Sequence, residues 1–473
     1  MRDGPAIERR RATITSPGHI PGVPEAVGRR GASVGHRARC PVPTFRCLLV
    51  IVLAWLLAFH PARAQDATLG AELERIARET AAIRGLPPLT DLDDVLLSRD
   101  ELLVRLPQLI AQDIDAEDAA AQSRSLAALG LLPDGTDLYD LTLRLIGEQA
   151  AGYYDPITDE MIVITDGDAE LGAEEYFYAH ENVHPLQDAH PDPNDLMEEP
   201  PDTNSDASLA ALALYEGDAV AASTAYLEQR PGLSLEILAE GMPEFPELDA
   251  APGAVVVALL FPYTEGAEFV ARLRRDGGWD AVNAAYADLP ASTEQVLHPG
   301  KYVQRDSPVS VVLPGPEALG DGWTSVDEDT LGELQTALLL AALGPGEGIN
   351  TVTGAVQLPE AARNAAAGWD GDRYALWEND GQEVLLWRSV WDTPAEARAF
   401  SRALAQFQQT RWGGLFSGEN PDDVALIAPR IAARIQLDGQ EVRYVQSPDP
   451  ALADAALAAL QAAPPPAPAP GPD

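Results

Sequence analysis

Apolar residues recur at helical spacing, about every 3.6 residues, over much of the first two thirds of the chain. The stretch GAELERIARETAAIRG shows this pattern and ends at Gly85, shortly before Pro87 and Pro88, as the C-terminus of a helix does. The same reasoning predicts helices within residues 70–112, from Leu138, from about Leu171, from Ser208, and at 251–274 and 279–287.

Strands are predicted where apolar residues alternate with polar ones or run together between turn residues. The β-branched run MIVIT, residues 161–165, lies between aspartate-rich turns and is typical of a short strand. Two alternating runs meet at Asp380-Gly381, and two more meet at Asp438-Gly439. Both patterns predict β-hairpins, because Asp-Gly favours the tight turn that joins antiparallel strands.

The pattern changes after about Asp306, and this change predicts two domains. Residues 65–305 would form a mainly helical domain with one short strand. Residues 306–462 would form a smaller domain with the two hairpins and with helices at about 393–410 and 450–462. The fold class is therefore expected to be α+β. The proline- and alanine-rich residues 463–473 are expected to be a disordered tail.

The N-terminal segment is typical of a secretory leader. An apolar run of 13 residues, 47–59, follows Arg46 and precedes Ala62-Arg63-Ala64. A basic region, a short apolar region and small residues at a cleavage site occur in this order in signal peptides. We expect residues 1–64 to be removed, with a translation start nearer Val42, and the mature protein to be secreted or periplasmic. The alternative is an uncleaved membrane anchor.

Charge and cysteine content exclude several classes of partner and chemistry. The chain after residue 64 carries 22 basic and 71 acidic residues, a net charge of −49. Nucleic acids and anionic membranes are therefore poor partners, because phosphate contacts need clustered arginine and lysine. Both cysteines, Cys40 and Cys47, lie in the leader. The mature chain can form no disulfide, thiolate metal site or cysteine nucleophile.

The candidate chemistry lies in AHENVHPLQDAH, residues 179–190, which holds three of the chain's seven histidines. Its HENVH segment places His180 and His184 one turn apart on one face of a helix. Two such imidazoles can take two corners of a zinc tetrahedron, and Glu181 can act as the base that accepts a proton from a zinc-bound water. We expect zinc as the cofactor. The alternative is a polar helix with surface histidines.

A catalytic zinc site needs a third protein ligand, and the sequence offers two candidates. His190 lies ten positions after His180, as in metzincins, but Gln187 stands where the metzincin turn has glycine. Glu216 lies on the next strong helix at a position flanked by apolar residues at core-like spacing, where a carboxylate needs a partner. We favour Glu216 and keep His190 as the alternative.

Several segments resemble a known class of enzymes. HENVH followed by a helix with EGDA looks like the gluzincin zinc metallopeptidases. The segments GYYDP, HENVHPLQDAH, NSDASLAALALYEGDA and STEQVLHPGKY are similar to motifs of a set of secreted bacterial proteins, over about residues 138–302. The resemblance implies a zincin-like fold for residues 65–305, with His180, His184 and Glu216 as metal ligands and Glu181 as the base. It also implies that residues 161–165 form the edge strand along which an extended peptide substrate lies.

Pro185 departs from the pattern of these bacterial proteins, which have alanine at this position. Proline lacks the N–H that would bond to the Glu181 carbonyl, and in a helix interior it costs about 3 kcal/mol. It also disfavours the helical conformation of the residue before it, His184. We expect the helix either to kink just past His184 or to end there.

Peptide hydrolysis develops an oxyanion that needs a hydrogen-bond donor besides the metal. His298 is the remaining histidine of the mature chain and lies in one of the shared segments. We assign it this catalytic role, with Tyr263 and Tyr302 as rivals. The structural alternative is a His298 that bonds a turn carbonyl before Pro299.

These observations predict a secreted zinc metallopeptidase that acts on peptides or proteins. The alternative from another class is a metal-binding scaffold or binding protein that has lost turnover, and Pro185 is the feature that favours it. A zinc hydrolase acting on non-peptide bonds is a third possibility. Metal analysis distinguishes a metal protein from a polar helix, and a proteolysis assay distinguishes the enzyme from the scaffold.

Overall fold

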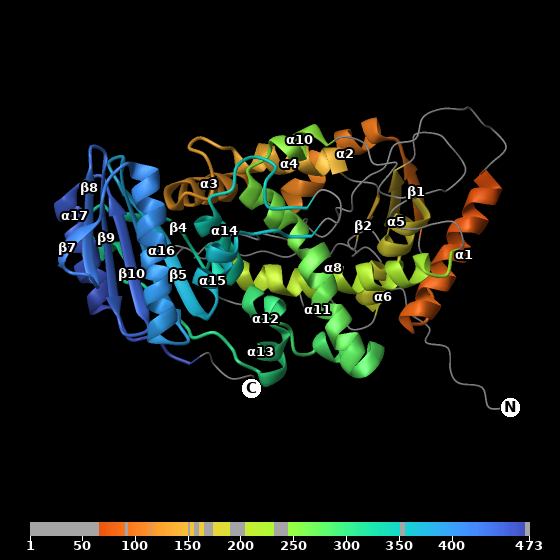
Figure 1. Ribbon diagram of the computed structural model, residues 1–473. Coiled ribbons are helices and arrows are strands. Elements are labelled where there is room, and N and C mark those ends of the chain that lie inside the picture. The colour runs from red at the N-terminus through yellow and green to blue at the C-terminus, as the bar shows by residue number, and fades with distance from the viewer. Residues whose placement is uncertain are drawn as a thin grey trace, which may run out of the picture. The chain divides into compact units, whose positions relative to one another are not determined.

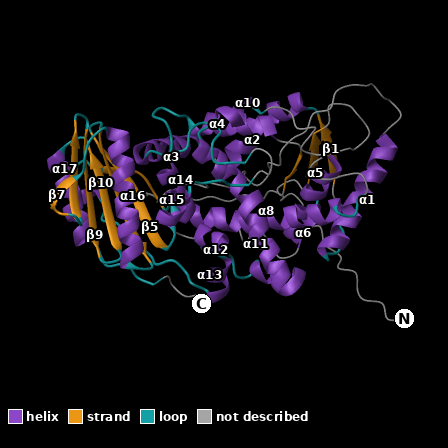
Figure 2. Ribbon diagram, in the orientation of Figure 1, coloured by secondary structure: helices purple, strands orange, loops and turns teal. Residues whose placement is uncertain are grey.

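The computed structural model describes residues 66–89, 93–113, 115–149, 152–155, 160–164, 174–189, 204–230, 245–350 and 355–468. The predicted leader, residues 1–64, and the alternative ligand His190 lie outside these ranges. The described chain is a mixture of α and β structure, which confirms the α+β class (Figure 1). Its strands fall into two sheets, one of three strands and one of seven (Figure 2).

The first part of the chain is mainly helical, as predicted. Its helices are α1 (Asp66–Arg84), α2 (Arg99–Asp113), α3 (Ala116–Leu129), α4 (Leu138–Gln149), α5 (Glu174–Glu181), α6 (Val183–Ala189), α8 (Ser205–Leu227), α10 (Pro246–Ala250), α11 (Gly253–Ala285), α12 (Thr293–Leu297) and α13 (Pro299–Gln304). Aspartate and asparagine side chains begin two of them: Asp115 accepts the N–H groups of Glu117 and Asp118, and Asn204 accepts that of Ala207.

The small sheet contains β1 (Asp93–Leu97), β2 (Gly152–Asp155) and β3 (Glu160–Ile164) in the order β1-β3-β2. Strand β3 confirms the strand predicted at residues 161–165. It is not an edge strand, however, because it pairs in parallel with β1 and antiparallel with β2. The expectation that it forms the peptide-binding edge is therefore wrong. Strand β1 also corrects the all-helical prediction for residues 70–112.

Helices α8 and α11 cross at two glycines. A Cβ on Gly217 would lie 2.2 Å from the carbonyl oxygen of Gly266, and a Cβ on Gly266 would lie 2.2 Å from that of Ala213. Only glycine allows the two backbones to approach this closely. Because Gly217 directly follows Glu216, the crossing brings α11 beside the predicted metal ligand.

Helix α11 corresponds to the two helices predicted at 251–274 and 279–287, which are joined across a kink at Gly277 and Gly278. By length and composition alone it is the one helix of the described ranges that could cross a membrane. It buries residues such as Val257, Phe261 and Phe269 in the main hydrophobic cluster, as the core helix of a globular protein does.

The seven-stranded sheet is antiparallel throughout, in the order β4-β5-β6-β10-β9-β8-β7. Its strands are β4 (Thr324–Asp329), β5 (Trp369–Asn379), β6 (Gln382–Trp391), β7 (Ser417–Asn420), β8 (Asp423–Ala428), β9 (Ile431–Asp438) and β10 (Glu441–Ser447). Both predicted hairpins, β5–β6 and β9–β10, are confirmed.

Two helices cover opposite faces of this sheet. Helix α16 (Pro394–Trp412) packs Phe400 against Trp387 and Trp391, and α17 (Pro450–Ala462) packs Leu457 in a second cluster with Leu386. Trp387 and Leu386 are adjacent on β6, and adjacent strand residues point to opposite faces. Between β4 and β5 the chain forms the helices α14 (Gly332–Ala341) and α15 (Glu360–Ala366). A short 3₁₀ turn, η2 (Pro316–Leu319), precedes β4.

Buried carboxylates accept backbone N–H groups at the starts of α8, α12 and α14, and two of these carboxylates lie on strands of the large sheet. Asp206 accepts the backbone N–H of Thr293, Asp329 accepts that of Ser205, and Asp372 accepts those of Leu331 and Gly332. The main hydrophobic cluster also takes residues from both sides of the predicted boundary at 305/306; that boundary stays a prediction. In the expected tail, Ala467 pairs with Ser310, and the Pro464 carbonyl accepts a bond from Arg388.

Candidate metal centre

Two helices separated by one residue carry the HENVH segment. Helix α5 ends at Glu181 and α6 begins at Val183, so that Asn182 lies between them. Pro185 explains the interruption, because the Glu181 carbonyl would need the N–H that proline lacks. Pro185 falls in the first turn of α6, where an N–H has no partner within the helix and proline is tolerated. The break thus precedes His184, whereas we expected it after this residue.

The interruption leaves the two imidazoles close together. The ring centroids of His180 and His184 are 5.1 Å apart. Glu216, on α8, lies between them: its Oε2 is 3.1 Å from His180 Nε2 and 3.6 Å from His184 Nε2. One donor atom from each of the three residues lies within 4.8 Å of the others, and all three side chains are buried. This group could bind a metal ion, and Glu216 takes the predicted third position in it.

The protonation states favour a cation at this position. Burial lowers the pKa of His180 to about 3 and that of His184 to about 4, so both rings are neutral at pH 7, the form that binds metals. Burial raises the pKa of Glu216 to about 7. The His184 Nε2 atom has no hydrogen-bond partner among the described residues. A buried lone pair without a donor is costly, and a metal ion would satisfy it.

Glu181 lies at the edge of this group. Its Oε2 is 4.0 Å from His184 Nε2, and neither carboxyl oxygen has a side-chain hydrogen-bond partner among the described residues. Burial, together with the nearby Glu216, raises the pKa of Glu181 well above its usual range, and the backbone N–H of Tyr154 on β2 opposes this rise. A divalent cation would favour the charged forms of both carboxyls.

Two tyrosines contact the group from neighbouring helices. The Tyr215 ring stacks on His184, with centroids 4.7 Å apart and planes inclined by 6°. Tyr263, on α11, has its ring centroid 6.0 Å from that of His180, and it moderates the raised pKa of the Glu216 carboxyl. Tyr263 is therefore the one of the three proposed oxyanion donors that lies beside the metal group.

The other two candidates have different partners. His298 follows α12, is about half exposed, and places its Nε2 2.9 Å from Glu333 Oε1. The Tyr302 hydroxyl donates to the Asp288 carbonyl. Hydrogen bonding to Glu333 raises the pKa of His298. The structure does not bring His298 into the group of metal-ligating residues, and its predicted catalytic role stays untested.

A chain of buried polar contacts extends from His184 to α1 and was not predicted as part of the site. His184 Nδ1 lies 2.9 Å from Gln187 Oε1, and Gln187 Nε2 contacts Asp218 and Tyr286. Arg84 completes the chain by donating from Nε to Asp218 Oδ1 at 2.7 Å. The sequence signal was available, since Gln187 follows a ligand by three residues and Asp218 follows Glu216 by two.

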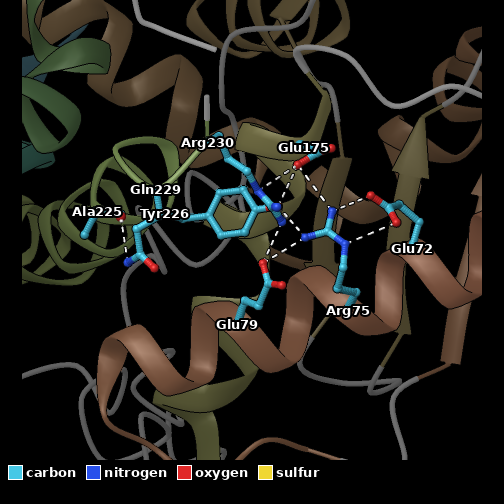
Figure 3. A network of polar contacts seen from close by, with 8 residues as sticks. All are labelled: Glu72, Arg75, Glu79, Glu175, Ala225, Tyr226, Gln229 and Arg230. Carbon is cyan, nitrogen blue, oxygen red and sulfur yellow. Dashed lines mark hydrogen bonds and ion pairs between the residues drawn. The ribbon is translucent and has the colours of Figure 1, made fainter. Parts of the chain in front are cut away.

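A second polar network holds α1 against the helices that supply the ligands (Figure 3). The Tyr226 hydroxyl, on α8, donates to Glu175 on α5 at 2.6 Å and accepts a bond from Arg230 at 2.6 Å. Arg75, on α1, contacts Glu175 and Tyr226 as well as Glu72 and Glu79. The network therefore links α1, α5 and the C-terminal end of α8.

Comparisons with known proteins add little to this geometry. A family model described as a domain of unknown function (DUF8575) matches residues 319–457, which is less than half of the chain. Comparisons with curated proteins and with solved structures give no match. The matched segment contains none of the three candidate metal ligands, so the assignment of a function depends on the site itself.

Proposed function

We propose that this protein is a secreted zinc-dependent metallopeptidase with a zincin-like catalytic region. The observation that supports this most directly is the convergence of His180, His184 and Glu216, with Glu181 beside them. Two neutral imidazoles and one carboxylate are a donor set that catalytic zinc sites use, with a fourth position left for substrate or water. The acidic, cysteine-free mature chain suits an exported protein.

Each site residue would have its own role in peptide hydrolysis. His180, His184 and Glu216 would hold the zinc ion, which supplies Lewis acidity that polarises a peptide carbonyl and acidifies water. Glu181 would accept a proton at its carboxylate and pass it to the leaving amine. Tyr263 would donate a hydrogen bond to the oxygen on which negative charge develops, because its ring lies beside that of His180 and it already acts on the Glu216 carboxyl.

Strand β2 is the better candidate for the peptide-binding edge. It lies at the end of the β1-β3-β2 order, and the backbone N–H of its Tyr154 lowers the pKa of Glu181, which places this strand beside the proposed base. An extended peptide that paired with this edge would pass close to the base and to the metal ligands. The role that the resemblance gave to residues 161–165 thus moves to residues 152–155.

The test is metal analysis combined with a cleavage assay on the purified full chain. We expect about one zinc ion per chain and chelator-sensitive cleavage of an unfolded protein such as casein. Glu181→Gln should abolish cleavage and keep the zinc, and Glu216→Gln should lose the zinc. Glu294→Gln changes an equally buried glutamate outside the site and should leave cleavage unchanged. A wild-type chain without zinc would disprove the proposal.

One observation favours the alternative of a metal-binding protein without turnover. All four site residues are at most 2% exposed, so the group presents little surface to a peptide substrate. Wild-type protein that holds zinc but fails to cleave unfolded substrates between pH 6 and 9 would support this alternative. The same preparation must bind zinc with its usual stoichiometry, so that a metal-free sample is not mistaken for an inactive one.

A further inference from the structure

The two histidines of the metal group differ in what contacts their second ring nitrogen. His184 Nδ1 lies 2.9 Å from Gln187 Oε1. His180 Nδ1, by contrast, has no hydrogen-bond partner among the described residues, and its Nε2 lies 3.1 Å from Glu216. A neutral imidazole carries one proton, and the group that its second nitrogen contacts decides which nitrogen carries it.

The surroundings of Gln187 fix the orientation of its amide. The Nε2 atom faces the Tyr215 carbonyl at 2.9 Å, the Asp218 carboxylate at 3.2 Å and the Tyr286 hydroxyl at 2.8 Å. The first two groups only accept hydrogen bonds, and the Tyr286 hydroxyl donates its own proton to Asp218 at 2.8 Å. Turning the amide over would place its oxygen against three acceptors. The amide nitrogen must therefore face this side, and Oε1 must face His184.

We propose that Gln187 is a positioning residue that fixes His184 in the tautomer protonated on Nδ1. With Oε1 as the acceptor, the proton of the neutral ring lies on Nδ1, and the lone pair of Nε2 faces Glu216 and Glu181. This is the lone pair that a metal ion needs. The inference concerns the metal-binding role in the proposed function, but the tautomer itself is a property of the metal-free chain.

The rest of the chain of contacts keeps Gln187 in place. Asp218 and Arg84 form a buried ion pair, and Arg84 also donates to Asn283 at 2.7 Å and stacks on Trp279. Gln187 is 1% exposed, so its amide is shielded from bulk solvent. Partners of this kind orient a ligating imidazole and raise its basicity, and their loss commonly weakens metal binding by about 10–100-fold.

The first experiment reads the tautomers directly. Proton–nitrogen correlation spectra of the metal-free, ¹⁵N-labelled full chain at pH 8 should show His184 protonated on Nδ1. His184→Gln identifies the signals by their loss. His180, whose Nε2 faces Glu216, is the internal comparison and should be protonated on Nε2. A His184 ring protonated on Nε2 in the wild-type chain would overturn the proposal, whether or not the protein binds zinc.

The second experiment measures the zinc dissociation constant by competition with a chelator. Gln187→Met keeps the volume and removes the acceptor, so it should weaken binding by about 10–100-fold and leave His184 in mixed tautomers. Gln408→Met makes the same change at an equally buried glutamine on α16 and should not alter zinc binding.

These results distinguish a failure of the positioning role of Gln187 from a failure of the proposed function. Unchanged zinc affinity in Gln187→Met, or an equal loss in Gln187→Met and Gln408→Met, would refute the positioning role. Absence of zinc binding in the wild-type chain would instead refute the proposed function, and the tautomer spectrum would still decide the role of Gln187. If Gln187→Met does not fold, the wild-type spectrum still decides the proposal, because a His184 ring protonated on Nε2 overturns it.

Discussion

Gly217→Ala tests whether the close crossing of α8 and α11 holds the metal group together. The added Cβ would lie 2.2 Å from the Gly266 carbonyl oxygen and 2.9 Å from the backbone nitrogen of Ala267. Ordinary contacts to a Cβ begin near 3.4 Å, so the two helices must separate by more than 1 Å. Both atoms belong to the backbone, and no side-chain rotation can relieve the overlap.

The magnitude follows from two opposing effects. Overpacking of this kind usually costs about 1–3 kcal/mol, whereas alanine in a helix interior is favoured over glycine by about 0.5–1 kcal/mol. Because the overlap is with backbone atoms, the cost of overpacking should lie at the upper end of its range, and we expect Gly217→Ala to lower the free energy of unfolding by about 2 kcal/mol. Gly70, inside α1, has no atom within 4 Å of an added Cβ. Gly70→Ala should instead stabilise the protein by about 0.5–1 kcal/mol.

The assay is urea denaturation of the two variants and the wild type, with zinc content measured on the same samples. Gly217→Ala should also hold less zinc, because Glu216 precedes the crossing and Tyr263 lies on the displaced helix. Gly266→Ala should cost a similar amount, and the double variant less than the sum, because one separation relieves both overlaps. A Gly217→Ala protein as stable as Gly70→Ala, with a full complement of zinc, would refute this reasoning.

Three further predictions concern the surroundings of the site. In the metal-free chain the buried rings of His180 and His184 resist the protons that unfolded histidines take up below about pH 6.5. The free energy of unfolding should therefore fall between pH 6.5 and 4, and replacing both by glutamine should flatten this dependence in urea titrations. Tyr226→Phe, which breaks the contacts to Glu175, should cost about 1–2 kcal/mol in thermal unfolding; no shift would contradict its role. Pro185→Ala should change stability by less than about 1 kcal/mol, not by the ~3 kcal/mol of a helix-interior proline, and should keep the zinc content unchanged.

The elements that were predicted correctly carry strong local signals. In the hairpin of β5 and β6, Asp380 and Gly381 both adopt positive φ, 48° and 77°, as the tight turn expected from Asp-Gly requires. Helix α8 begins at Ser205, three residues before the predicted start, and is rich in alanine and leucine. The HENVH spacing likewise places His180 and His184 on the same side of the chain. In each case the residues that decide the structure lie within a few positions of one another.

The errors arose where a distant partner decides the structure. Strand β1 has a short sequence, DDVLL, beside long helical stretches, and it becomes a strand through parallel pairing with β3, which lies more than 60 residues later. The same pairing makes β3 a central strand. Strand β4, TSVDED, is too polar to be recognised alone and gains its identity at the edge beside β5. The pattern of residues within one segment does not indicate which distant strand it pairs with.

The candidate site shows the same division between local and distant determinants. A local rule treats Pro185 as a defect in a ligand-bearing helix, yet the imidazoles converge because their positions do not depend on helix continuity. His180 is placed by α5, which the network around Glu175 holds against α1, and His184 is held from outside by Gln187. A one-residue break between two ligands is tolerable when each ligand has its own support. If His184 lost its support, the break at Asn182 would leave its ring free to turn, and metal affinity would fall even though all three ligands were present.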